Sequence, residues 1–153
     1  MVDTTVMYVI HGLFGALWTG SVLFVAVAVL PVAVDGKLEP DAFGSLVGRL
    51  RWITRISALL LLVSGGHLAG TLYDANTLLG TGSGHLVLTM LGLWLGLAAV
   101  VEIGSARAAR GIEAGKKREP ARDAKPFYYA GAVFSVGLLL TAGLLGTARI
   151  TGF

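Results

Sequence analysis

The sequence predicts an all-α integral membrane protein, a single bundle of four transmembrane helices with both termini outside. Three observations predict this fold class. The 153 residues are 55% hydrophobic and only 14% charged, a composition typical of multi-pass membrane proteins. Four long runs contain no Asp, Glu, Lys or Arg. The basic residues gather in the segments that follow the first and third of these runs.

The first charge-free run extends from Thr4 to Val34. As a helix it would be roughly 45 Å long, which exceeds the roughly 30 Å hydrocarbon core of a bilayer. It is apolar all the way round, unlike a helix at the surface of a soluble protein. We therefore predict the first span at residues 5–34. The preceding MVDTT lacks the basic region and cleavage site of a signal peptide, so we expect this span to be retained.

The other three spans are predicted at residues 50–73, 84–108 and 126–149, all within one domain over residues 1–153. Pro40 and Asp41 can start an amphipathic helix that leads into the second span. The stretch ANTLLGTGSG, residues 75–84, reads as a turn before the third span. That span is expected to run on through Glu102 to Arg110, and the segment GKKREPARDAK after it reads as a solvated linker.

Arginine and lysine predict the orientation. Those between the first and second spans and those between the third and fourth are, in order, Lys37, Arg49, Arg51, Arg55, Arg107, Arg110, Lys116, Lys117, Arg118, Arg122 and Lys125. The segment between the second and third spans has none. The positive-inside rule then puts the basic loops in the cytoplasm, and both termini and the Asp74 loop outside. The net charge of +3 is thus a topology signal and predicts no nucleic-acid partner.

Composition and motifs exclude several kinds of site. The chain has no cysteine, which rules out disulfides, thiolate metal sites and cysteine nucleophiles. The glycine-rich residues 80–84 lack the lysine of a phosphate-binding loop. Glu102 reads as an interface residue that pairs with Arg107 or Arg51. The expected environment is the lipid bilayer of the plasma membrane.

Three histidines, His11, His67 and His85, fall in the outer part of the predicted bundle. An ionisable residue inside a span is costly, so each is a candidate functional residue. We expect a shared ligand site. The alternative for each is an imidazole that only hydrogen-bonds neighbouring backbone or hydroxyl groups.

Heme b is the first candidate ligand. Two neutral imidazoles from different helices can hold heme iron axially inside a bundle. His11 is one expected ligand, and the second is His67 rather than His85, because the second span is continuous at His67.

Further residues suit a heme at this depth. Gly15 and Gly66 would let a porphyrin edge approach the backbone. Trp18 would pack on the macrocycle, and Arg149 would pair with the propionates. The alternative readings are helix packing for the glycines and interfacial anchoring for Arg149.

Copper is the second candidate ligand. Met7 precedes His11 by four residues, so the two share a helix face, and Met90 lies a little over one turn beyond His85. Thioether and imidazole groups together suit Cu(I). The residues alone do not decide between copper and heme.

A resemblance to a known family suggests the same two ligands, copper and heme. The pattern His11-x6-Trp18-x-Gly20, followed by Phe24, resembles the first span of the copper-resistance protein D (CopD) family, and Arg51-Trp-Ile-Thr-Arg, leading to Ser64-Gly65, resembles its second helix. HemJ-type protoporphyrinogen oxidases share the His-x6-Trp pattern. The resemblance covers the first three spans. It implies a four-helix bundle with copper passage or heme-linked redox chemistry at His11.

One feature of the HemJ-type oxidases is missing. No Pro-Arg pair follows the first span, since Pro31 precedes Val32, which does not favour the porphyrinogen oxidase activity. The favoured reading is electron transfer through heme b, to a redox partner or a larger membrane complex. The alternatives are CopD-like copper handling and a structural accessory subunit without a cofactor. Enzyme activity and a homo-oligomeric state stay open.

Overall fold

The computed structural model describes residues 3–116 and 119–151, with the side chains of residues 3–116 and 119–147. Within that part the chain forms helices joined by short turns, and no strand occurs. The predicted all-α class is confirmed.

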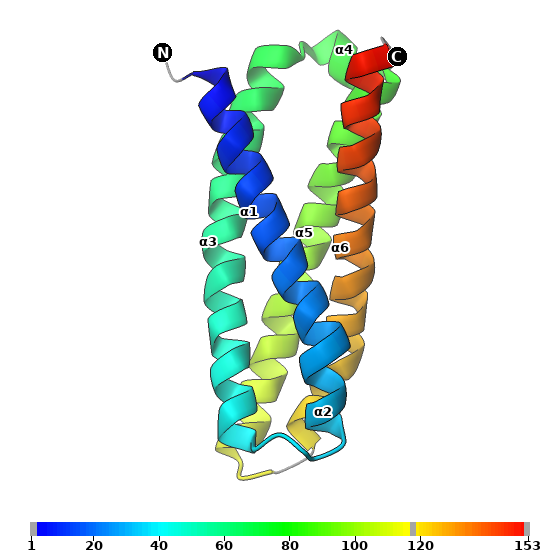
Figure 1. Cartoon of the computed structure of the whole chain (residues 1–153). Coiled ribbons are helices and arrows are strands. Elements are labelled where there is room, and N and C mark those ends of the chain that lie inside the picture. The colour runs from blue at the N-terminus through cyan, green and yellow to red at the C-terminus, as the bar shows by residue number, and fades with distance from the viewer. Residues whose placement is uncertain (1–2, 117–118, 152–153) are drawn as a thin grey trace.

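Four long helical segments lie side by side (Figure 1). In chain order the elements are α1 (Thr4–Phe24), the π-helix η1 (Val25–Val29), α2 (Leu30–Val34), α3 (Pro40–Leu72), α4 (Ala75–Gly80), α5 (Gly82–Glu113) and α6 (Glu119–Thr151). The first three join into one continuous segment. The start of α1, the end of α6 and the short α4 share one end of the bundle, which we call the terminal end (Figure 1). The α2–α3 and α5–α6 connections share the opposite end, the loop end.

Three helical segments are long and apolar enough to cross a membrane, namely Thr4–Val34, Gly82–Glu113 and Glu119–Thr147. The charge-free part of α3 runs only from Ile56 to Leu72, about 25 Å of helix. The lengths and compositions of the three segments are those of a membrane protein.

Two expected helix extensions are present. α3 is continuous from Pro40, which occupies the first helical position, into the predicted second span. α5 runs past Glu102 and ends at Glu113, just before Gly115, whose φ of 72° stops a helix at little cost. Both extensions bring charged residues onto the same helices as the apolar spans.

Two boundaries differ from the sequence-based reading. Residues 75–84 do not form a simple turn, because the Asp74 carboxylate accepts from the Thr77 N–H at 2.7 Å and starts the helix α4. α6 begins at Glu119, inside the segment read as a linker, and Pro126 lies within it. A proline inside a helix removes one backbone hydrogen bond but does not end this helix.

Buried side chains gather toward the loop end. Among the described residues, the buried series of α1 begins at Trp18, and that of α6 ends at Ser135. A Cβ on Gly131 of α6 would lie 3.1 Å from Val22 Cγ1 and 3.6 Å from Leu97 Cδ1. Helices α1, α5 and α6 therefore meet here at a separation that glycine permits.

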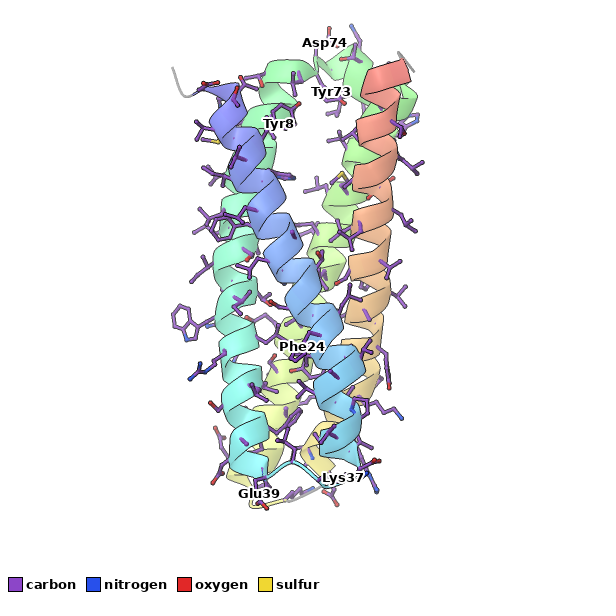
Figure 2. All side chains as sticks on the ribbon, in the orientation of Figure 1. Tyr8, Phe24, Lys37, Glu39, Tyr73 and Asp74 are labelled. Atoms are coloured by element: carbon purple, nitrogen blue, oxygen red, sulfur yellow. The ribbon has the colours of Figure 1, made fainter. Side chains whose placement is uncertain are left out.

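Toward the terminal end the helices pack as two pairs. α1 contacts α3, where Gly15 faces Leu61, and α5 contacts α6, where Gly96 faces Phe134. α1 starts beside α3 and crosses to α6 at the loop end (Figure 1). Figure 2, which draws the side chains, shows the α1–α3 pair apart from the α5–α6 pair at the terminal end.

Three exposed leucines of α5 lie where the α1–α3 and α5–α6 pairs separate. Leu88, Leu91 and Leu95 of α5 are 36%, 46% and 56% exposed. Helical spacing puts them on the face that continues to Glu102, where α5 is bonded to α3. This face is covered near the loop end and uncovered toward the terminal end. We call the separated part the open half.

Candidate functional site

His11 joins α1 to α3. Its Nδ1 lies 3.0 Å from the Ser64 hydroxyl, and its ring covers Gly65, where a Cβ would lie only 2.9 Å from the imidazole Cε1. The imidazole is half-buried and needs glycine at position 65. Ser64 and Gly65 therefore form the surface of α3 against which the His11 ring packs.

The Ser64 hydroxyl determines which tautomer the neutral His11 imidazole adopts. Its oxygen lies 2.6 Å from the Leu60 carbonyl, to which it can only donate. With its single proton used there, the hydroxyl accepts from His11 Nδ1–H. The other ring nitrogen, Nε2, then carries the lone pair, the form in which a neutral imidazole binds a metal.

His67 lies on α3 three residues, a little less than one turn, beyond Ser64. Its Nε2 is buried and has no hydrogen-bond partner among the described residues. Buried polar atoms in proteins are nearly always paired, so an orphaned ring nitrogen calls for an explanation. The structure therefore puts two imidazoles with a free ring nitrogen on the α1–α3 pair.

His85 lies elsewhere. It is exposed in the first turn of α5, and its Nε2 is 2.8 Å from the Leu79 carbonyl of α4. No described contact joins it to the other two histidines. The part of the chain that the structure describes also holds no cluster of three or more His, Cys, Asp or Glu that could bind a metal.

The other expected site residues have diverse surroundings. Trp18 is fully buried and donates to Thr54 Oγ1 at 3.0 Å, which makes it a link between α1 and α3. Gly15 packs against Leu61, whereas a Cβ on Gly66 would meet nothing within 4 Å. The remaining three are Met7 and Met90, both half-buried, and Arg149, whose side chain lies outside the described residues.

A charged cluster joins α3 to α5. Glu102 accepts from Arg51 Nε at 2.7 Å and from Arg55 Nε at 2.6 Å. Of the two partners expected for Glu102, Arg51 is present, and Arg107 instead lies over the Phe127 ring at 4.7 Å. Arg55 was not expected as a partner.

Sequence reasoning also missed a line of hydroxyls on α3. Thr54, Ser57 and Ser64 are all buried and face α1 or the bundle interior. Their spacing of three and seven residues was the available signal, because residues so spaced share a helix face. Ser105 and Tyr128 form a similar buried pair between α5 and α6, with oxygens 3.1 Å apart.

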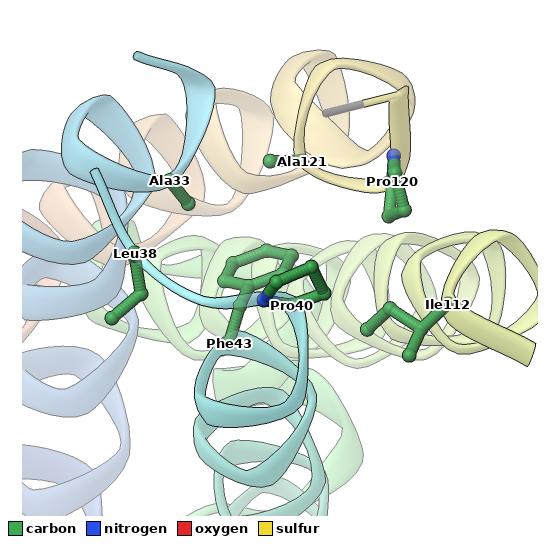
Figure 3. Close-up of a pocket in the computed structure, with 7 residues that line it drawn as sticks. All are labelled: Ala33, Leu38, Pro40, Phe43, Ile112, Pro120 and Ala121. Carbon is green, nitrogen blue, oxygen red and sulfur yellow. The ribbon is translucent and has the colours of Figure 1, made fainter. Parts of the chain in front are cut away.

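Two hollows lie at the loop end, away from the histidines. The smaller, drawn in Figure 3, is lined by Ala33, Leu38, Pro40, Phe43, Ile112, Pro120 and Ala121. The larger is a groove of about 200 Å³ between α3 and α5, lined by Gly44, Val47, Gly48, Arg51, Ser105, Ala109, Ile112 and Glu113. Neither contains a histidine.

No model of a known family matches this chain, and no curated protein or solved structure matches it. The ring nitrogens of His11 and His67 that lack a hydrogen-bond partner among the described residues are of the type that can ligate heme iron or a metal ion.

Proposed function

We propose that this protein is a four-span membrane protein of the plasma membrane that binds heme b through His11 and His67. The observation that carries the proposal is the hydrogen bond between His11 and Ser64, because it holds the imidazole in the form with a free Nε2. The orphaned Nε2 of His67 supplies a candidate second ligand.

The four-span topology has its own support. Lys37, Arg49, Arg110 and Lys116 all belong to the loop end, so positive-inside orientation makes that end cytoplasmic and the terminal end external. α3 would be the fourth span, since Arg55 can extend its side chain to the interface and lengthen a short apolar stretch. The histidine pair then lies in the outer half of the membrane.

The heme would occupy the open half. A Cβ on Gly66 would meet nothing within 4 Å, so the backbone there is open to the edge of a ring, and a bound heme would supply one-electron redox chemistry. This chain would orient the ligands, exclude water and, through Arg149, pair with the propionates. Such a site suits electron transfer to a redox partner or to a larger membrane complex.

The test is a visible absorption spectrum of the detergent-purified protein, first oxidised and then reduced with dithionite. We expect a Soret band and the sharp reduced bands of a low-spin b-type heme. His11→Ala and His67→Ala should each change or remove these bands. His85→Ala is the matched control and should leave them unchanged. A flat spectrum from cells supplied with heme would overturn the proposal.

Copper handling is the second candidate, favoured by Met7. This methionine shares a face of α1 with His11, and both side chains are half-buried. A thioether and an imidazole so arranged suit Cu(I), with Met90 as a further ligand. Copper bound by the colourless protein and lost in Met7→Ala would support this function. A protein that has no colour, binds no copper and co-purifies with other membrane proteins would support the role of an accessory subunit.

A further inference from the structure

The cluster of Arg51, Arg55 and Glu102 holds two positive charges and one negative charge. Arg51 uses only its Nε for Glu102, and Arg55 uses its Nε and one terminal nitrogen. The terminal nitrogens left over have no acceptor among the described residues. The cluster therefore carries one unbalanced charge and several unused N–H donors.

The position of the cluster matches a membrane–water boundary. The charge-free part of α3 begins at Ile56, directly after Arg55. Between the two arginines lies Trp52, which is 65% exposed, and exposed tryptophans favour the level of the lipid headgroups. The side chains of Arg51 and Arg55 are themselves 36% and 50% exposed.

The groove between α3 and α5 begins at this cluster. Arg51 is one of its lining residues, so one guanidinium faces both Glu102 and the groove. Gly48 leaves room there, since a Cβ on it would meet nothing within 4 Å, whereas a Cβ on Gly44 would lie 3.0 Å from Ile112 Cδ1. Exposed Leu59 and Leu62 continue from Arg55 toward the opposite leaflet on the same face of α3.

We propose that Arg51 and Arg55 bind the phosphate of an anionic phospholipid in the leaflet at the loop end. Guanidinium groups donate in parallel pairs to phosphate oxygens, and the unbalanced positive charge favours a headgroup with net negative charge. The headgroup lies over the groove, and the acyl chains begin at the exposed Leu59, one turn beyond Arg55. Glu113, in the same groove, disfavours a headgroup that carries a second phosphate.

The experiment measures lipid retention by native mass spectrometry of the purified protein with phosphatidylglycerol or phosphatidylcholine. We expect phosphatidylglycerol to bind more tightly. A juxtamembrane basic residue contributes about 1 kcal/mol, so Arg51→Gln and Arg55→Gln should each weaken its binding about fivefold. Arg49→Gln is the matched control, because Arg49 is exposed on another face of α3, and it should leave binding unchanged.

A further variant separates binding from folding. Glu102→Gln removes the competing carboxylate and should leave phosphatidylglycerol binding equal or tighter, even if the bundle is less stable. Equal binding of the two lipids, or equal loss in Arg49→Gln, would overturn the proposal. Displacement of the lipid by millimolar inorganic phosphate would also overturn it, since the site would then bind soluble phosphate.

Discussion

His11 of α1 and Ser64 of α3 form a hydrogen bond of 3.0 Å across the helix pair that borders the open half. The same hydroxyl donates to the Leu60 carbonyl, so the imidazole, the hydroxyl and the backbone form one chain of donors and acceptors. This relationship makes Ser64 a positioning residue for His11, and it can be tested separately from any ligand.

Ser64→Ala should destabilise the bundle by about 1–3 kcal/mol, because it leaves His11 Nδ1–H without its acceptor. The matched control is Ser57→Ala. Its hydroxyl is equally buried on α3 but has no partner among the described residues, so its removal should be neutral or stabilising. Unfolding by denaturant in detergent measures both. Equal losses in the two variants would contradict the role given to Ser64.

Gly65→Ala should destabilise the protein by about 1–3 kcal/mol, since the new methyl group would lie 2.9 Å from His11 Cε1 and force the ring to move. Gly66→Ala has free space and should be neutral or up to about 1 kcal/mol stabilising, as expected for alanine in a helix. Thermal unfolding compares the two variants. If heme binds beside Gly66, Gly66→Ala should lower heme content without lowering stability.

The Trp18–Thr54 hydrogen bond should give a measurable coupling energy. Trp18→Phe and Thr54→Val each remove one partner of the 3.0 Å bond, and the double variant removes both. Interhelical hydrogen bonds in membrane proteins average about 0.6 kcal/mol, with a maximum near 1.7 kcal/mol. A double-mutant cycle on the free energy of unfolding should return a value in this range. Strict additivity of the single changes would show that the bond contributes nothing.

The start of α4 should respond to acid. Hydrogen bonds from the Thr77 backbone and side chain hold the pKa of Asp74 below its ordinary value of 3.8. Because the pKa is lowered in the folded state, the carboxylate stabilises α4 fully at pH values above its ordinary pKa of 3.8. This stabilisation is lost as the pH falls through the lowered value. The NMR shift of the Thr77 amide should therefore titrate with a midpoint below 3.8, and Asp74→Asn should abolish that titration.

The sequence was most informative about helices and their chain order. Charge-free runs and Pro40 predicted the apolar segments and the continuous α3, because length and composition depend only on local residues. The helix α4 was missed, since the glycine and threonine residues around it suggest turns and only the Asp74–Thr77 capping pair indicates a helix.

The candidate site was less predictable because an apolar span carries no signal for its rotation about its own axis. The three histidines could be assigned a depth but not a direction. As a result His85 was grouped with His11, although its ring is held at the α4–α5 corner. The hydrogen-bond partner of Trp18 could not be predicted from the sequence either, since only the packing of α1 on α3 brings Trp18 to Thr54.

The concentration of most buried core residues toward the loop end has a mechanical consequence. The contact of α1, α5 and α6 at Gly131 fixes these three helices relative to one another at that level. Toward the terminal end the α1–α3 and α5–α6 pairs separate, and the α4 connection joins the ends of α3 and α5 there (Figure 1). The angle between the two pairs is therefore constrained by side-chain packing at one end and by a chain connection at the other.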